Sequence, residues 1–247
     1  MPCCYVRYCL NHNTNVKEDE MNEGTLMSRF DAKVLRSKPQ VLHQLAELYC
    51  DIFSMDPNFG EYRQCPVCKG YFNHQQVEVE GVRFCENNHP KTEIVPAWEV
   101  EKVKVEILDQ SSEQGFFGVL AFLNQKVVGF AWARVILFPE VRKHWGDKII
   151  DKVQPYAKTL NLVYFDELAV DLKKRNKGLG KEMVVFVCRW AKQEHPDDMT
   201  LLRTHKDSPA KHIYESIGYI IFADDTEYGG GRVMMKADRC RDLNVTV

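Results

Sequence analysis

The sequence lacks a long hydrophobic run, an export signal and a strong net charge. No apolar stretch approaches the roughly 20 residues that a membrane-spanning helix needs, and the first residues lack the basic and then apolar pattern of a signal peptide. Lysine and arginine number 33 against 35 aspartates and glutamates, a net charge of −2 in 247 residues, so the electrostatic footprint of a nucleic-acid binder is missing. We therefore expect a cytoplasmic protein that binds neither membranes nor nucleic acids.

The nine cysteines indicate thiols and metal ligands rather than disulfides, because their number is odd and no export signal accompanies them. Cys65 and Cys68 flank a tight turn, and Cys85 and His89 follow as a second pair. Two such pairs form the Cys3His set of a tetrahedral zinc site, and four protein ligands leave no open position for water. We therefore expect a structural zinc-knuckle module over residues 61–93.

The segment between the two ligand pairs predicts a β-hairpin, because apolar and polar residues alternate from 77 to 84 and Glu80-Gly81 suits a turn. A module of this size cannot bury a core, so metal binding would supply its folding free energy. His74 is an alternative ligand with poorer spacing, and a set of unrelated side chains is the other interpretation.

The middle of the chain holds a strand, a basic turn and a helix. The strand at 162–170 is apolar apart from Asp166 and Glu167, and the turn after it carries four cations together with Gly178 and Gly180. Backbone N–H groups at a helix start are unpaired and carry partial positive charge, and glycines let an anion approach them. This pattern is typical of a phosphate or pyrophosphate site, although an ordinary turn with a solvated basic face has the same composition.

Two common nucleotide-binding loops are excluded by what this turn lacks. A Walker loop needs Ser or Thr after Gly-Lys, whereas Gly180-Lys181 is followed by Glu182. A Rossmann loop needs three glycines and an acidic ribose ligand about 20 residues further on, and only two glycines are present here. The turn therefore matches neither of these two loops.

Apolar periodicity outlines the rest of the chain, whose 45% hydrophobic and 28% charged residues are ordinary for a globular protein. The patterns predict a weakly structured segment at 1–33, a short strand at 34–36, helices at 41–53, 96–110, 139–153 and 210–216, a hairpin of 118–123 with 126–137, and strands at 199–204, 219–222 and 232–236. The segment 96–110 also fits a strand. The alternation gives one α/β (α+β) domain over 34–240, with a mixed sheet and helices on both faces, and a tail at 241–247.

Two motifs resemble those of one enzyme family. The pattern Arg175-x-x-Gly178-x-Gly180, after a strand that ends at Val170, resembles the acetyl-CoA motif of the GCN5-related N-acetyltransferase (GNAT) superfamily. The run 214–219 is similar to that family's last helix, although Asp207 stands where Asn is commoner. The motifs have the family's order and separation. The resemblance covers roughly residues 34–236, with 64–90 as an insertion.

The resemblance implies a mostly antiparallel twisted sheet and direct transfer of acetyl from acetyl-CoA to an amine. The acceptor would be a small polyamine, an aminoglycoside-type amine or a protein amine, and the enzyme would be a monomer or a homodimer. The implied acetyl-CoA residues are Leu168, Ala169 and Val170 for the thioester and pantetheine arm, and Arg175, Asn176, Lys177, Gly178, Leu179 and Gly180 for the pyrophosphate.

Three residues are expected to move protons. The helix tyrosine, Tyr214, would serve the departing thiolate. Asp166 is the first choice for the base that deprotonates the amine, because some family members carry a carboxylate nine residues before the position of Arg175. Glu167 is the second choice, and strand alternation would place the two carboxylates on opposite faces. The alternative is that both carboxylates pair with cations and water carries the proton.

A function of a different class is a degenerate GNAT domain that binds without catalysis and presents the zinc module to a protein partner. The intact set of Arg175, Gly178, Gly180 and Tyr214 favours the enzyme, because a non-catalytic domain has no chemical need for these residues together.

Overall fold

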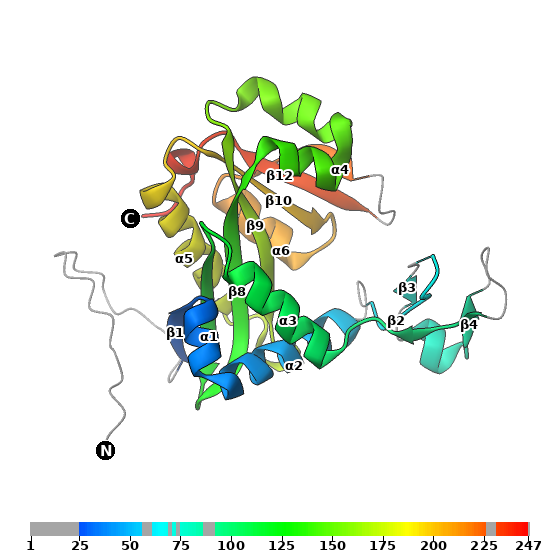
Figure 1. Cartoon of the computed structure of the whole chain (residues 1–247). Helices are drawn as coiled ribbons and strands as arrows, with labels where there is room; N and C mark the ends of the chain where they lie inside the picture. The colour runs from blue at the N-terminus through cyan, green and yellow to red at the C-terminus, as the bar shows by residue number, and fades with distance from the viewer. Residues whose placement is uncertain are drawn as a thin grey trace, which may run out of the picture.

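A seven-stranded sheet forms the centre of the structure, a computed structural model that describes residues 25–55, 61–68, 71–72, 75–85, 92–225 and 231–246. The strands lie in the order β1-β7-β8-β9-β10-β12-β11 (Figure 1). Their bounds are β1 Thr25–Phe30, β7 Phe117–Leu123, β8 Lys126–Leu137, β9 Asn161–Val170, β10 Met199–His205, β12 Arg232–Ala237 and β11 Ile220–Asp225. Neighbours are antiparallel except β9 and β10, which are parallel, so the expected mixed, mostly antiparallel sheet is confirmed.

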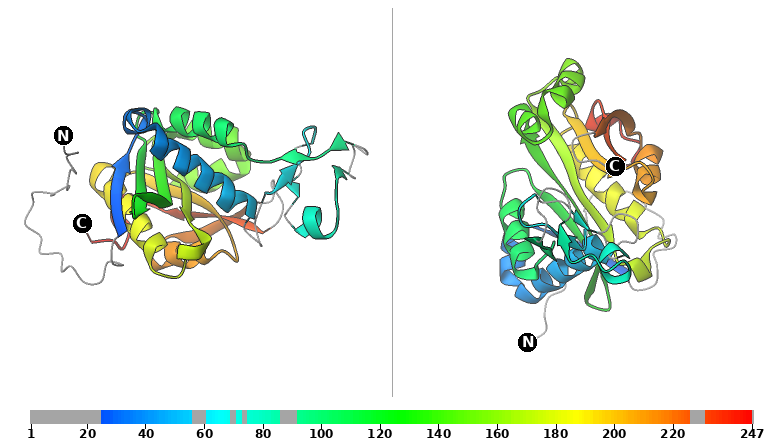
Figure 2. Two further views of the ribbon diagram at one scale, coloured as in Figure 1. Left: turned by 90° about the horizontal axis from the view of Figure 1, so that it is seen from below. Right: turned by 90° about the vertical axis from the view of Figure 1, so that its right-hand side faces the viewer.

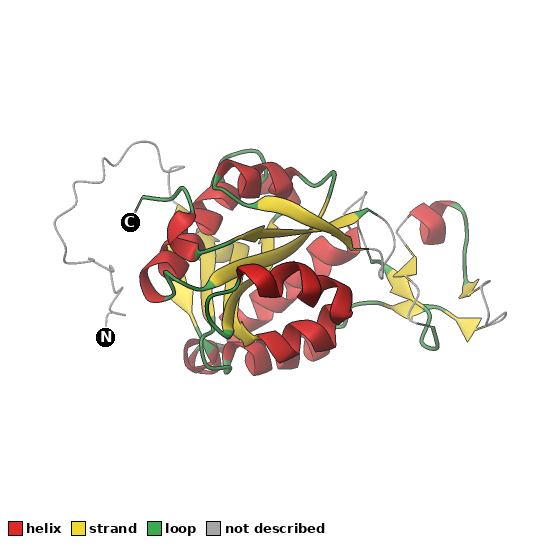
Figure 3. Cartoon of the chain, turned by 90° about the horizontal axis from the view of Figure 1, so that it is seen from above, coloured by secondary structure: helices red, strands yellow, loops and turns green. Residues whose placement is uncertain are grey.

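Helices cover both faces of this sheet (Figure 3). One face carries α1 (Ala32–Ser37), α2 (Pro39–Met55), α3 (Val100–Ser111) and α4 (Phe138–Val153), and the other carries α5 (Leu179–Glu194) and α6 (Pro209–Ser216). Short 3-10 turns lie at Gln154–Tyr156, Leu172–Lys174 and Cys240–Asp242. None of the described helices is both long enough and apolar enough to cross a bilayer.

Strand β8 shows how alternation divides the core. Trp132 is buried in the cluster beneath α1, α2 and α3, and Ile136 in the cluster beneath α4. The intervening odd-numbered Ala131 and Ala133 are buried in the cluster beneath α5 and α6. From residue 130 to residue 136, the even-numbered face of β8 thus supports two helix layers side by side, and the odd-numbered face supports one.

Most elements expected from periodicity are present. The predicted helices at 41–53, 139–153 and 210–216 correspond to α2, α4 and α6, and the predicted hairpin corresponds to β7 and β8. The segment 96–110 is helical over α3 and does not form a strand.

The expectation of a strand at 34–36 is wrong. These residues belong to α1, and the Asp31 carboxylate accepts a hydrogen bond from the Val34 amide at 2.8 Å, which caps the helix. A side-chain cap of this kind satisfies an amide that has no partner within the helix.

Ordered structure also begins earlier than the sequence indicated. Residues 25–30, expected to be weakly structured, form β1, an edge strand antiparallel to β7. Phe30 accounts for this, because its ring is 1% exposed and packs edge-to-face on Trp132 with the centroids 6.1 Å apart. Residues 1–24 lie outside the described part of the chain.

An inserted module between α2 and α3 projects from the body (Figure 2). It contains β2 (Arg63–Gln64), β3 (Tyr71–Phe72), β4 (Phe84–Cys85), β5 (Thr92–Glu93), β6 (Val95–Pro96) and a π-helical turn at Gln75–Val79. The expected hairpin with a turn at Glu80-Gly81 is wrong, because the first half of that segment is helical. Val77 is 2% exposed and Val79 is 76% exposed, so the alternating valines do not share one buried face.

Candidate active site

Strands β9 and β10 pair only at their beginnings. Residues 162–165 of β9 lie in parallel register with 199–202 of β10. Beyond that point β9 continues to Val170 beside β8, and β10 continues to His205 beside β12. The two strands therefore separate toward their carboxyl ends, which is where α/β sheets bind ligands.

A pocket of about 510 Å³ opens beside the separated end of β9. The residues that line it are Ile52, Phe53, Leu168, Ala169, Val170, Lys174, Arg175, Asn176, Gly178, Leu179, Gly180, Lys181, Ser208, Pro209, Ala210 and Ile213. All of the residues expected to hold acetyl-CoA are among them except Lys177, which lies in the same turn. The expected residues therefore do meet at one cavity.

The turn before α5 has the backbone that an anion site requires. Gly178 precedes the helix with a φ of 82°, a left-handed conformation that glycine adopts without strain. Arg175 Nε donates a hydrogen bond to the Val170 carbonyl at 3.2 Å, which ties the turn to the end of β9. The first amides of α5 have no partner within the helix, and the helix dipole adds positive charge beside Gly178 and Gly180 in the pocket lining.

The free edge of β9 offers two backbone donors. The Asp171 amide donates to the Val128 carbonyl of β8 at 2.9 Å, and successive amides along a strand point in opposite directions. The amides of Leu168 and Val170 therefore point away from β8, toward the side from which β10 has separated. Both residues line the pocket.

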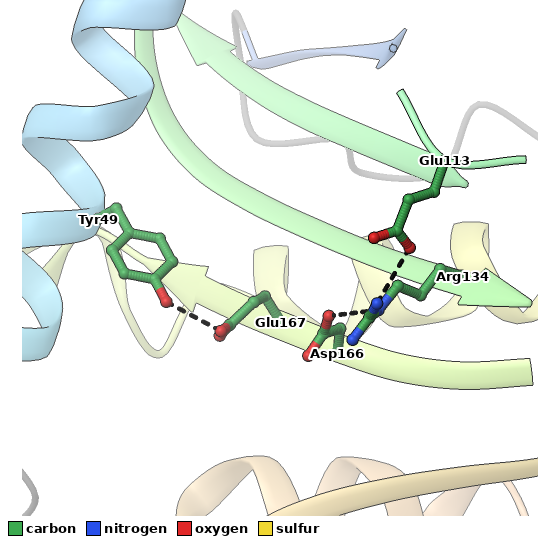
Figure 4. A network of polar contacts seen from close by, with 5 residues as sticks. All are labelled: Tyr49, Glu113, Arg134, Asp166 and Glu167. Atoms are coloured by element: carbon green, nitrogen blue, oxygen red, sulfur yellow. Dashed lines mark hydrogen bonds and ion pairs between the residues drawn. The ribbon is translucent and has the colours of Figure 1, made fainter. Parts of the chain in front are cut away.

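A β-bulge changes the expected arrangement of the two carboxylates. Trp132 of β8 lies opposite Glu167 and Ala133 lies opposite Phe165, so Asp166 has no opposite residue. The extra residue interrupts the alternation of side chains. Both carboxylates then contact groups on the α2 and α3 side of the sheet (Figure 4). The expectation that they lie on opposite faces is wrong.

Asp166 belongs to an ion-paired network. Arg134 donates from Nε to Asp166 Oδ2 and from Nη1 to Glu113 Oε2, each at 3.0 Å. The Arg134 side chain is 15% exposed and that of Asp166 is 13% exposed, so little water screens the pair. Burial raises the pKa of Asp166, and the Arg134 charge opposes that rise. A fixed cation therefore competes with any proton for this carboxylate.

Glu167 has a neutral partner instead. It accepts a hydrogen bond from the Tyr49 hydroxyl at 3.0 Å. Burial and the charge of Asp166 raise the pKa of Glu167 to about 8, while the Tyr49 hydrogen bond lowers it. A carboxylate with this pKa is a far stronger base than an ordinary glutamate. Glu167 is next to Leu168 in β9, and Tyr49 lies one helical turn before Phe53 in α2. Both Leu168 and Phe53 line the pocket.

Tyr214 lies in α6, whose residues Ala210 and Ile213 line the pocket. Its side chain is 5% exposed, and its ring packs edge-to-face on Phe165 and Tyr219 with centroids 5.6 and 5.9 Å away. Burial raises the pKa of this phenol far above its ordinary value. The hydroxyl therefore keeps its proton at neutral pH, as a proton donor must.

Comparison with known protein families identifies the fold and its chemistry. The model described as the acetyltransferase (GNAT) family matches residues 84–219, more than half of the chain. This chain belongs to the GNAT family. As a GNAT protein it is an acetyl-CoA-dependent N-acetyltransferase.

Solved structures of other proteins are similar to this one at low sequence identity. NAA60 of Arabidopsis thaliana, solved with a bisubstrate analogue, is 14% identical, with 86% of this chain and 97% of that chain covered and a TM-score of 0.50. A GNAT acetyltransferase from Streptococcus pneumoniae is 13% identical over 86% of this chain and 96% of that chain, with a TM-score of 0.45. The aminoglycoside acetyltransferase meta-AAC0020, from an uncultured soil metagenomic sample, is 17% identical over 80% of this chain and 89% of that chain, with a TM-score of 0.44. No curated protein sequence matches the chain.

The inserted module adds a cluster of thiols to the GNAT body. The Sγ atoms of Cys65, Cys68 and Cys85 lie within 4.8 Å of one another, and those of Cys68 and Cys85 are 3.7 Å apart. A tetrahedral ion with Zn–S bonds of about 2.3 Å would place its sulfurs about 3.8 Å apart, so the cluster fits such an ion. The two histidines considered as the fourth ligand, His89 and His74, lie outside the described residues.

Three residues of this GNAT site were not expected from the sequence: Tyr49, Glu113 and Arg134. Arg134 interrupts an otherwise apolar strand, and an isolated cation in a buried strand is a signal for a buried partner. Tyr49 carries no such signal, because it reaches Glu167 across 118 residues of sequence and resembles the other apolar residues of its helix.

Proposed function

We propose that this GNAT enzyme transfers acetyl from acetyl-CoA to a primary amine that lies on the Glu167 side of β9. The acceptor class is a polyamine, an aminoglycoside-type amine or a protein amine. The observation that carries the proposal is the meeting of two features at the separated end of β9. These are a glycine-containing helix start that suits a pyrophosphate and a carboxylate whose pKa is raised to about 8.

Acetyl-CoA would lie along the pocket with its pyrophosphate at the start of α5. The amides near Gly178 and Gly180 would donate to the phosphate oxygens, and Arg175 and Lys177 would add positive charge. The pantetheine arm would run beside β9, where the amides of Leu168 and Val170 are directed away from β8. This arrangement supports an acetyl-CoA-binding role for the residues that the family motif indicates.

The acceptor must lose a proton before it attacks, because an alkylammonium ion with a pKa near 10 is not nucleophilic. We assign Glu167 as the base in preference to Asp166, which was the first choice from the sequence. Asp166 is engaged by the Arg134 guanidinium at 3.0 Å, whereas Glu167 accepts from the neutral Tyr49 hydroxyl and has the pKa of about 8 that suits a base near neutral pH.

Tyr214 is the proposed proton donor to the departing thiolate. Glu167 takes a proton from the ammonium, directly or through water, and the free amine bonds to the thioester carbon. The thioester oxygen gains negative charge, which the Leu168 or Val170 amide would stabilise. The C–S bond breaks, the thiolate takes the Tyr214 proton, and the second nitrogen proton replaces it. Ammonium and acetyl-CoA thus yield an amide, CoA and one proton.

The module would hold a structural Zn²⁺ through Cys65, Cys68 and Cys85, with His89 as the fourth ligand expected from the sequence. The separation of 3.7 Å between the Cys68 and Cys85 sulfurs supports this assignment. A closed site of this kind supplies a crosslink that orders a small module, and its ion does not contact the reacting atoms.

An amine screen tests the proposed function. The purified chain is incubated with acetyl-CoA and spermidine, kanamycin or a short peptide with a free α-amine, and the released CoA thiol and the mass of the product are measured. We expect amine-dependent release that is lost in Glu167→Gln and retained in Glu101→Gln, an exposed carboxylate on α3. Binding of acetyl-CoA without transfer to any of these amines would contradict the proposal and favour a GNAT domain that presents its module to a protein partner.

A further inference from the structure

The inserted module is anchored at the acceptor side of the site. Where the chain enters the module, the Glu61 amide donates to the Phe53 carbonyl at the end of α2, 2.6 Å away. The Glu61 carboxylate pairs with Arg232 of β12 at 2.9 Å, and its side chain is 16% exposed. The first residue of the described module is therefore fixed both to the end of α2 and to strand β12.

The outgoing chain returns to the same place. The ring of Trp98, which follows the module, packs on Tyr49 and Phe53 with centroids 5.3 and 6.0 Å away. Tyr49 is the residue whose hydroxyl donates to Glu167. The module thus touches, through its outgoing end, the side chain that orients the proposed base.

Backbone pairing joins the incoming segment, residues 61–64, to the outgoing segment, residues 95–98. We call these two paired segments the neck of the module. β2 and β6 are antiparallel neighbours, with Arg63 opposite Pro96. The Ala97 amide donates to the Tyr62 carbonyl at 3.3 Å, and Gln64 Nε2 donates to the Ala97 carbonyl at 3.2 Å. A displacement of one strand of the neck therefore displaces the other strand, because hydrogen bonds join them.

The neck also contributes charge to the base. Four groups act on the Glu167 carboxylate: Tyr49 from α2, Asp166 from β9, Arg203 from β10 and Glu61 from the module. Arg203 of β10 lies opposite Met234 of β12. Arg232, the ion-pair partner of Glu61, comes two residues before Met234 and therefore lies on the same face of the sheet as Arg203. The module thus supplies one of the charged groups around the proposed base.

The thiol cluster is continuous with this neck. Cys65 follows β2 directly in the chain and is 0% exposed. Because a module too small for its own core depends on metal binding for its fold, an ion held by Cys65, Cys68 and Cys85 would also order β2 and the residues paired with it.

We propose that the inserted module completes the acceptor side of the active site, with Glu61 as a positioning residue for Glu167, so that Zn²⁺ binding by the module controls acetyl transfer. The proposal rests on the proposed function for its effect on turnover. Its structural part, the coupling of the metal cluster to α2 and β9, can be tested without any acceptor.

Amide hydrogen exchange tests the coupling. The full chain is stripped of metal with a chelator and then restored with Zn²⁺ alone. We expect faster exchange at the end of α2 and along β9 in the stripped chain, reversed by Zn²⁺, with α5 and the affinity for acetyl-CoA unchanged. A change confined to residues 61–97 would overturn the proposal, whether or not any amine is acetylated.

Replacement of the anchor tests the positioning role. In Glu61→Gln we expect kcat to fall about tenfold, with zinc content and acetyl-CoA affinity unchanged. Loss of the negative charge should also move the acid limb of the pH–rate profile to lower pH, because Glu61 helps to raise the pKa of Glu167. The matched control is Glu93→Gln, an exposed carboxylate in the same module. Rates and a pH profile equal to those of Glu93→Gln would overturn the role of Glu61.

Discussion

Replacing Asp166 with Asn should move the acid limb of the pH–rate profile toward lower pH. Burial and the charge of Asp166 are the two largest causes of the raised pKa of Glu167, about 8. At an effective dielectric constant of about 20, two unit charges about 4 Å apart interact by roughly 4 kcal/mol, or about three pKa units, and the interaction weakens in proportion to distance. Both side chains retain some contact with water, which screens the interaction, so we expect a shift of about one unit.

The sign follows from the role of Glu167 as a base. A carboxylate must be deprotonated to accept a proton, so the rate rises with pH through its pKa. At pH 7 about a tenth of wild-type Glu167 and about half of the variant's would be deprotonated. Asp166→Asn should therefore lose least activity below neutral pH. At alkaline pH it should be slower than wild type, because Glu167 is then a weaker base.

Initial rates of CoA release at saturating amine, measured from weakly acidic to alkaline pH, give the pH midpoint of the acid limb directly. The control is Asp151→Asn, an exposed carboxylate on α4, which should leave the midpoint in place. A midpoint that does not move in Asp166→Asn, with the variant folded and active, would refute the assignment of Glu167 as the base.

Three further changes probe the other parts of the site. Tyr49→Phe should move the same midpoint to higher pH, opposite to Asp166→Asn, because it removes a hydrogen bond that favours the charged form of Glu167; an unchanged midpoint would separate Tyr49 from the base. Tyr214→Phe should lower kcat by about 100-fold with acetyl-CoA affinity nearly intact, measured by turnover beside calorimetry, and equal turnover would remove Tyr214 from the mechanism. Cys65→Ser should lose bound metal and raise proteolysis within residues 61–97 while the GNAT body stays folded; wild-type protein that contains no zinc by metal analysis would end the zinc assignment.

The pocket assigned to acetyl-CoA in our proposal was predictable because its residues are nearly contiguous. A strand, a turn with a left-handed Gly178 and a helix start fix the pocket lining through local geometry, and local geometry follows from local sequence. The same holds for Cys65 and Cys68, whose spacing alone brings two thiols together.

The proposed acceptor side was not predictable, because it depends on contacts between distant segments. A bulge opposite Trp132 and Ala133 moves Asp166 out of the alternation, and no residue type marks that position. The pairing of Tyr49 with Glu167 spans 118 residues. The early strand β1 was missed for the same reason, since Phe30 is stabilised by packing on Trp132 and not by its own neighbours.

Calorimetric titration with acetyl-CoA tests the central claim most directly. The wild-type chain is compared with Gly178→Glu and with Gly81→Glu, two substitutions at glycines with similar left-handed φ angles of 82° and 76° and without a neighbour closer than 3.9 Å. We predict saturable binding by wild type and by Gly81→Glu, and none by a folded Gly178→Glu, whose carboxylate would occupy the place of the pyrophosphate. Equal affinity in all three proteins, or no binding by the folded wild-type chain, would contradict the assignment of the pocket beside β9 to acetyl-CoA.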